Sequence, residues 1–310
     1  MEGKRAANVG VLGKGKRVAG QGTRGVGCHA NSPSMEQAAY ACPDGVTLEL
    51  RHHAGPGSAR RVLVIKGLGG CAGEDGLVRA LQSRFVVTTV SPRGAGGSGG
   101  SFTLAQHLAD LEGLLSHVAQ QDGAPPLVVG HSLGAWALGV LLGRQPLAQR
   151  AVLLAPLLNI LEQTPVWFVN HITAAVKQDR IPTAVRVAAF AYSSFVSPPS
   201  GQRRAGRLAV DQQRFDPPDV LPFLRGLLNA PLVEAPLRVP TQVLLAGKAN
   251  TGLRLRNLDQ LATAWRERVG PAGEVETHGH LDHFMALGGP FFESRHTEQL
   301  TQRMLAFLHG

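Results

Sequence analysis

The sequence predicts an α/β protein in which a mostly parallel sheet is wound on both sides by helices and carries one helical insertion. Two observations predict this fold class. Short, almost continuously apolar runs alternate with longer stretches at helical spacing, as expected of parallel strands buried on both faces. Between Leu157 and Val239 the alternation stops for about 80 residues, too long for an ordinary loop, and helical patterns take its place.

Six apolar runs are the expected strands of this sheet. In chain order they are residues 62–65, 85–90, 126–129, 151–155, 241–246 and 274–277. Helices are expected where apolar residues recur every three or four positions. These segments are residues 104–118, 133–142, 255–269 and 297–308, with residues 167–176 and 184–195 inside the insertion.

The domain organisation follows from these segments and from the composition of the N-terminus. We expect a basic tail at residues 1–34, a core formed by residues 35–156 and 240–310, and an insertion at residues 157–239. The tail contains eight glycines and no apolar periodicity, which predicts disorder. Domain-like sequence starts at Met35, so the tail is a candidate upstream extension rather than part of the working protein.

Charge and aromatic content argue against a nucleic-acid partner. The first 34 residues hold six basic side chains and one acidic side chain, a net of +5, which leaves only +4 of the total +9 for the rest of the chain. That balance is modest for a folded region of this size. Aromatic residues make up 5% of the chain, too few for a platform of stacked bases.

Several features predict a cytoplasmic protein without a transmembrane segment. The longest strongly apolar run, residues 151–161, is about half of the roughly 20 residues that a spanning helix needs. The basic N-terminus lacks the apolar stretch of a signal peptide. Cys28, Cys42 and Cys71 form no C-x-x-C pair, which favours a reducing compartment.

Ser132 is the candidate nucleophile, because it is the centre of the Gly-His-Ser-Leu-Gly pattern at residues 130–134. An apolar strand precedes this G-x-S-x-G pattern and a helix of small residues follows it, which is the context of a nucleophile elbow. A serine at the start of a helix stands among free N–H groups that stabilise negative charge, and the N–H of Leu133 can donate to an oxyanion. The alternative is a serine that only caps the helix. A second match, around Ser98, has no helix after it.

With these motifs the chain resembles the α/β-hydrolase superfamily, in its capped esterase, lipase and serine aminopeptidase branch. Gly67 and Leu68 after the first strand are similar to the family's oxyanion loop, and residues 93–98 are similar to its Arg-Gly-x-Gly-x-Ser loop. The resemblance implies an α/β-hydrolase fold, a second oxyanion N–H at Leu68, and a helical cap formed by the insertion. Two positions depart from the family: Lys66 replaces its usual histidine, and Ser91 replaces its usual aspartate.

The resemblance places the general base, which a serine nucleophile needs, just after the last strand. Two histidines there fit family patterns, His283 in Asp-His-Phe and His280 in Gly-His, and both stay candidates. Residues 278–283 also fit the H-x-H-x-D-H zinc motif of another hydrolase family. That motif needs further ligands downstream, and only 27 residues follow His283. We therefore expect no metal and no organic cofactor.

The acid that normally orients the imidazole is missing from its family position, where Asn250 ends a Gly-Lys-Ala-Asn turn. An asparagine can accept the imidazole hydrogen bond but brings no charge. Three interpretations stay open. Another carboxylate replaces the acid, the enzyme works with Asn250 in a weakened triad, or catalysis is lost and the pocket only binds. The candidate substitutes are Asp259, Glu162 and Asp282.

The expected function is that of a serine hydrolase that cleaves an ester or thioester of an apolar acyl group through an acyl-enzyme intermediate. Apolar side chains of the insertion would line the acyl pocket. The alternative is a catalytically impaired protein of the same fold that binds a small apolar ligand or a protein partner. The sequence names neither the acyl and leaving groups nor the oligomeric state.

Overall fold

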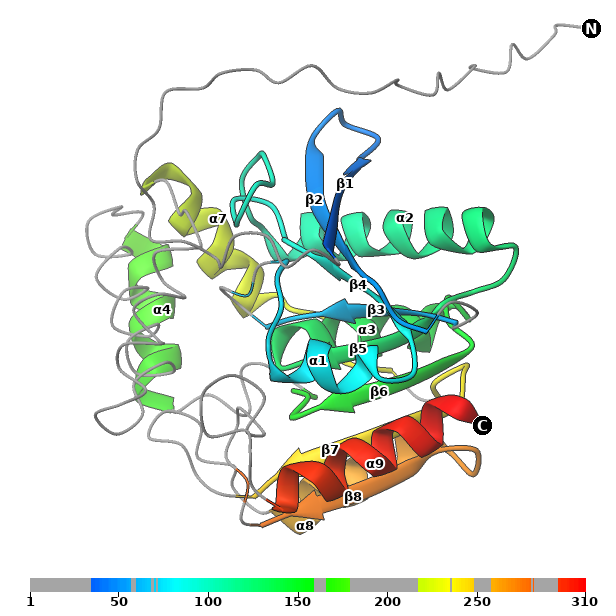
Figure 1. Ribbon diagram of the computed structural model, residues 1–310. Coiled ribbons are helices and arrows are strands. Elements are labelled where there is room, and N and C mark those ends of the chain that lie inside the picture. Colours follow the sequence, from blue (N-terminus) through cyan, green and yellow to red (C-terminus); the bar gives the residue numbers. More distant parts are fainter. Residues whose placement is uncertain are drawn as a thin grey trace, which may run out of the picture. The chain divides into compact units, whose positions relative to one another are not determined.

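One sheet of eight strands runs through the described part of the chain, in the order β1-β2-β4-β3-β5-β6-β7-β8 (Figure 1). The strands are β1 (Met35–Ala41), β2 (Thr47–His53), β3 (Arg61–Ile65), β4 (Val86–Val90), β5 (Leu127–His131), β6 (Arg150–Leu154), β7 (Thr241–Ala246) and β8 (Glu274–His278). The strands from β4 to β8 in that order pair in parallel, and β1 and β2 join them antiparallel. The predicted mostly parallel sheet is confirmed.

The computed structural model describes residues 35–56, 60–67, 70, 72–158, 166–178, 217–234, 236–247, 258–279, 281 and 295–310. All of them belong to one compact unit, residues 31–310. No helix in these ranges is both long enough and apolar enough to cross a membrane.

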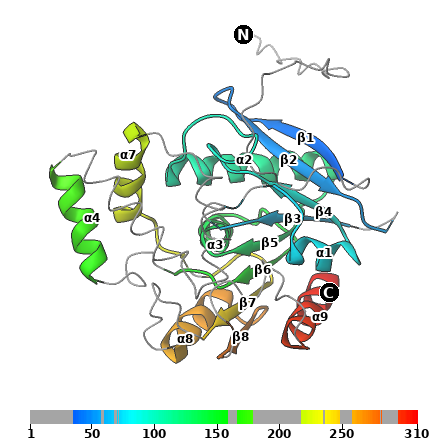
Figure 2. The same ribbon diagram turned by 60° about the vertical axis from the view of Figure 1, so that its left-hand side comes forward.

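Helices cover both faces of the sheet because successive strand residues point to opposite sides. Val62 and Val64 of β3 pack in a cluster with α1 (Gly76–Gln82) and α9 (Arg295–His309). Leu63 and Ile65 of the same strand pack in a second cluster, with α2 (Leu104–Asp122), α3 (Leu133–Arg144) and α8 (Leu258–Val269). Figure 2 shows α1 and α9 together on one side of the sheet.

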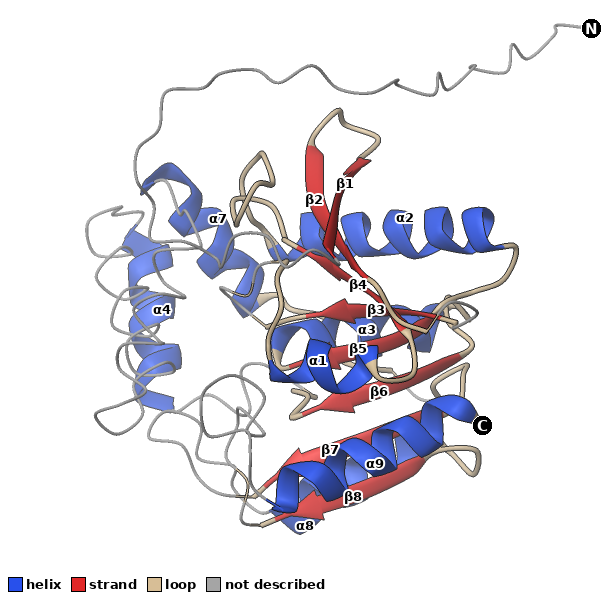
Figure 3. Ribbon diagram, in the orientation of Figure 1, coloured by secondary structure: helices blue, strands red, loops and turns tan. Residues whose placement is uncertain are grey.

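Among the described residues, two further helices fall within the predicted insertion (Figure 3). α4 (Val166–Gln178) and α7 (Pro217–Leu228) contact one another, and α7 also contacts α2. The ring of Phe223 in α7 lies 5.9 Å from that of Phe102, two residues before α2. Two prolines open α7, which its first turn tolerates because that turn needs no N–H donor. The helix predicted at residues 184–195 lies outside the described residues, and the division into tail, core and cap stays a prediction.

A buried ion pair ties the loop after β4 to α2. The guanidinium of Arg93 donates from Nε and Nη2 to the two carboxylate oxygens of Asp110, at 2.6 and 2.7 Å. Both side chains are about 95% buried, with exposed fractions of 5% and 4%. Asp44 binds the outer edge of the same guanidinium at 2.7 Å. These hydrogen bonds raise the pKa of Arg93 above its usual value, so its charge is fixed.

Glu49 of β2 holds the same loop on both sides of Arg93. The carboxylate accepts from the Ser91 hydroxyl and from the Gly97 N–H, both at 2.8 Å. Burial alone would raise the pKa of Glu49, but the hydrogen bonds from Gly97, Ser91 and Arg51 lower it overall. Ser91 stands where the resembled family usually has an aspartate. The carboxylate of Glu49, from a neighbouring strand, lies beside it.

Burial of His107 predicts that acid destabilises the fold. Its imidazole is buried on α2 beside the Phe102 ring, and burial lowers its pKa from 6.5 to about 4, against the opposing effect of Asp110. Between pH 6.5 and 4, His107 therefore binds a proton in the unfolded chain but not in the folded chain, so the free energy of unfolding falls as the pH falls. We expect up to about 3 kcal/mol of lost stability over this window.

The measurement is urea denaturation of the wild type and of His107→Leu at pH 7, 5.5 and 4.5. The variant should lose less stability than the wild type on going from pH 7 to 4.5. Some dependence should remain, because burial also lowers the pKa values of His52 and His53. Equal pH slopes for the two proteins would contradict the assignment to His107.

Candidate active site

Ser132 stands at a strained turn between β5 and α3. Its backbone has φ 55° and ψ −118°, values that a residue with a side chain rarely adopts. Its N–H donates to the carbonyl of Leu154 in β6 at 2.9 Å, and its own carbonyl accepts from Trp136 at 2.9 Å. Strain of this kind persists only where the surroundings impose it, and it clusters at functional sites.

Two glycines make this turn possible. A Cβ atom at Gly134 would lie 2.3 Å from the carbonyl oxygen of Ile65 and 2.6 Å from that of Lys66. A Cβ atom at Gly130 would lie 2.7 Å from the Cα of Ala135. Glycine at both positions thus lets the first turn of α3 pack directly against the end of β3 and the end of β5.

The loop after β3 begins directly beside Ser132. A Cβ atom at Gly67 would lie 3.0 Å from the Cβ of Ser132 and 3.4 Å from its Oγ. Leu133, the first of the two predicted oxyanion donors, is the first residue of α3 and is almost fully buried. Leu68, the second, lies outside the described residues. The structure therefore brings together Ser132, Leu133 and the start of the predicted oxyanion loop.

The turns that carry the predicted base and acid leave the sheet side by side. The N–H of Gly247, after β7, donates to the carbonyl of His278, at the end of β8, at 2.9 Å. A Cβ atom at Gly247 would lie 2.6 Å from the Cα of Gly279. Both turns are at the carboxyl ends of parallel strands, the edge where Ser132 also lies. His280, His283 and Asn250 follow these turns but lie outside the described residues.

The remaining sequence candidates are not brought to Ser132 by what the structure describes. Asp259 is exposed in the first turn of α8. Glu162 and Asp282 lie outside the described residues. Of the zinc motif only His278 is described, and its Nε2 lies 3.6 Å from the Glu276 carboxylate. Within the described ranges, no three His, Cys, Asp or Glu residues gather as metal ligands would.

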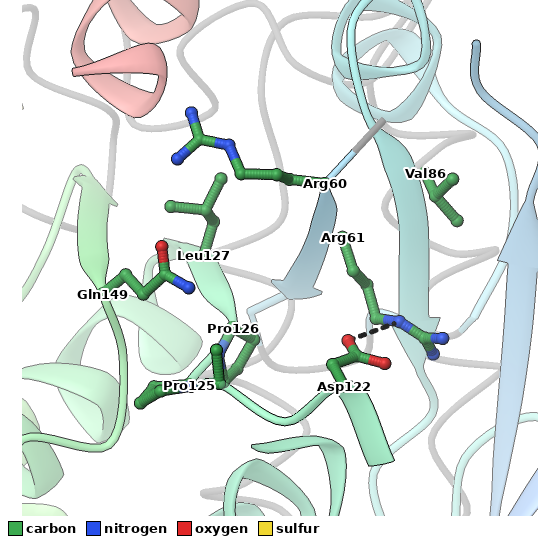
Figure 4. A pocket seen from close by; sticks show the side chains of 9 residues that line it. Arg60, Arg61, Val86, Asp122, Pro125, Pro126, Leu127 and Gln149 are labelled. Carbon is green, nitrogen blue, oxygen red and sulfur yellow. Dashed lines mark ion pairs between the residues drawn. The ribbon is translucent and has the colours of Figure 1, made fainter. Parts of the chain in front are cut away.

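A hollow of about 400 Å³ lies where the parallel strands begin, away from the strand ends next to Ser132 (Figure 4). Its lining includes Arg60 just before β3, Arg61 of β3, Val86 of β4 and Leu127 of β5. Arg61 pairs with Asp122 at 3.0 Å. Arg60 donates to the last carbonyls of α9. Ligands of open α/β sheets bind at the carboxyl ends of the strands, so this hollow is not part of the candidate site.

The sheet order and the turn at Ser132 define an α/β-hydrolase-type fold, and comparison with known proteins agrees. A model of the alpha/beta hydrolase family matches residues 62–293, about three quarters of the chain. The protein belongs to the alpha/beta hydrolase family. No curated protein matches the sequence.

Solved structures with the same fold have different activities in their names. An esterase, RhEst1 from Rhodococcus sp. ECU1013, is 17% identical with a TM-score of 0.62, covering 89% of this chain and 99% of its own. The enol-lactonase from Burkholderia xenovorans LB400 is 19% identical with a TM-score of 0.59, covering 88% and 100%. An AqdC variant, which recognises the Pseudomonas quinolone signal and cleaves its ring, is 15% identical with a TM-score of 0.63, covering 89% and 100%. At these identities the likeness shows the fold alone.

Proposed function

We propose that the protein is a serine hydrolase that cleaves an ester or thioester of an apolar acyl group. Ser132 Oγ attacks the carbonyl carbon, and His283 or His280 takes the hydroxyl proton. The oxyanion of the tetrahedral intermediate accepts from the N–H groups of Leu133 and Leu68. The histidine then gives its proton to the leaving alcohol or thiol, and an acyl-enzyme remains.

The second half of the reaction uses the same groups with water. The histidine takes a proton from a water molecule as the water oxygen attacks the acyl carbon, and a second tetrahedral intermediate forms. When this intermediate collapses, the histidine returns the proton to Ser132 and the carboxylic acid is released. Side chains and backbone N–H groups suffice for every step, so the mechanism uses no cofactor. Structures of an esterase and of an enol-lactonase have the same fold, so the fold is compatible with ester-type chemistry.

The observation that carries this proposal is the backbone of Ser132. A serine that merely capped α3 would take extended backbone angles and accept a hydrogen bond from the first turn. Ser132 instead has φ 55°, and its side chain makes no capping hydrogen bond. Together with Gly67 at its side, this geometry supports a role for Ser132 as the attacking nucleophile.

Asn250 supports the second candidate, a protein of this fold that binds a small apolar ligand or a protein partner without turnover. Loss of the charged acid in a Ser-His-Asp triad lowers turnover by about 10⁴-fold. A pocket that has lost its catalytic acid can retain its shape and its ligand. The two candidates differ in whether Ser132 is activated.

Labelling with a fluorophosphonate probe, followed by intact-mass measurement, distinguishes them. We expect one adduct on the wild type and none on Ser132→Ala. Ser98→Ala is the matched control, since Ser98 shares the G-x-S-x-G pattern but its hydroxyl donates to the Ser91 carbonyl at 2.7 Å. That variant should label like the wild type. A folded wild type that takes no probe would favour the binding protein.

A further inference from the structure

The described residues of the loop between β3 and α1 fold around the side chain of Lys66. The stem lies under Gly70, where a Cβ atom would come within 2.5 Å of the Lys66 Cβ and 3.4 Å of its Cδ. The ammonium donates to the carbonyl of Gly73 at 2.9 Å and lies 2.8 Å from the Asp75 carboxylate. One side chain thus contacts the loop near its start, its middle and its end.

Asp75 passes this constraint on to α1. One of its carboxylate oxygens binds Lys66, and the other accepts from the N–H of Val78 at 3.0 Å, which caps the helix. The Lys66 and Asp75 side chains are 15% and 27% exposed, so solvent screens this ion pair less than a surface pair. The pair therefore joins the end of β3 to the first turn of α1.

The backbone of Lys66 packs against the turn that carries Ser132. The carbonyl oxygens of Lys66 and Ile65 leave no room for a Cβ atom at Gly134. Gly67, the next residue, lies beside Ser132. The residue whose side chain spans the loop therefore also borders the turn at Ser132 through its own backbone.

We propose that Lys66 is a positioning residue that holds the start of this loop against Ser132. Its ammonium acts through Gly73 and Asp75 and touches no reacting atom. Lysine suits this role because its four-carbon stem spans the loop and its head has three donors. The catalytic part of this inference rests on the proposed serine hydrolase function. The structural part, that Lys66 orders the loop, does not.

The variants separate the charge from the stem. Lys66→Met keeps an unbranched stem and removes the ammonium. Lys66→Arg restores a cation. Arg79→Met is the matched control, because Arg79 pairs with Glu74 next to the same loop but is 59% exposed, with a distance of 3.5 Å. The substrate is p-nitrophenyl butyrate, an activated ester of a short apolar acid.

We expect Lys66→Met to lower kcat by roughly 10- to 100-fold with KM changed by less than about twofold, because the loop acts on the transition state more than on binding. Lys66→Arg should recover most of the loss, and Arg79→Met should stay within about twofold of the wild type. A merely structural role for Lys66 would lower the melting temperature and leave kcat of the folded protein unchanged.

Amide hydrogen exchange tests the same inference without turnover. Peptides that cover residues 66–78 should exchange faster in Lys66→Met than in the wild type or in Arg79→Met. Unchanged exchange in Lys66→Met would overturn the proposal, and so would a folded variant with unchanged kcat. If the wild type hydrolyses no ester and takes no fluorophosphonate, the proposed function fails, and exchange alone decides whether Lys66 orders the loop.

Discussion

Replacing Gly67 with alanine should lower kcat/KM for p-nitrophenyl butyrate by about 10²- to 10³-fold and leave the protein folded. The new methyl group would lie 3.4 Å from the Oγ of Ser132 and 3.0 Å from its Cβ. In the proposed mechanism, it would occupy the space beside the hydroxyl that the ester carbonyl enters. The φ of Gly67 lies outside the left-handed region, so alanine can adopt the backbone and the effect comes from the methyl group.

Gly73→Ala is the control for this prediction, because Gly73 belongs to the same loop and a Cβ atom there would meet nothing within 4 Å. Steady-state kinetics of both variants, with melting temperatures, make the comparison. Gly73→Ala should retain the activity of the wild type within about threefold. Equal activity of the two variants would show that the space beside Gly67 is not the approach to Ser132.

Replacing Asp110 with alanine should destabilise the fold by about 3–5 kcal/mol. The change leaves the guanidinium of Arg93, whose side chain is only 5% exposed, without the carboxylate that binds two of its nitrogens. Removing one partner of a buried pair strands the other charge away from water, and this penalty exceeds the loss of the contact itself. Urea denaturation at pH 7 measures the difference in the free energy of unfolding.

Asp44→Ala removes the other carboxylate from the same guanidinium and serves as the comparison. The Asp44 side chain is 44% exposed, so water can replace it on the outer edge of Arg93. We expect its loss to destabilise the fold much less than the loss of Asp110 does. Similar losses for the two variants would mean that burial does not govern the strength of this cluster.

The parts of the fold that the sequence predicted well are those that short-range patterns determine. Each of the six predicted strands is present within one or two residues, since strands buried on both faces are continuous apolar runs. β1 and β2 were not predicted, because polar residues such as Glu36, Gln37 and Arg51 interrupt their apolar character. They form an antiparallel hairpin at the sheet edge, with one side open to solvent.

Contacts between distant positions were beyond the sequence. Ser91 and Lys66 looked like losses from the family pattern, because one sequence shows which residue is absent but not which neighbour compensates. The carboxylate that Ser91 binds is that of Glu49, which comes from another strand. Lys66 binds Asp75 across a loop whose folding no local pattern predicts. The roles of Ser132, Leu133, Leu68, His280, His283 and Asn250 stay predictions.

The turn at Ser132 also decides when conformational entropy is lost. Hydrogen bonds to Leu154 and Trp136 fix both sides of the serine, and Gly134 is packed on β3. This ordering takes place once, as the chain folds, and not again each time a ligand arrives. An incoming molecule therefore meets a serine backbone that is already preorganised, and differences in affinity between ligands should come from the parts of the pocket that still have freedom to lose.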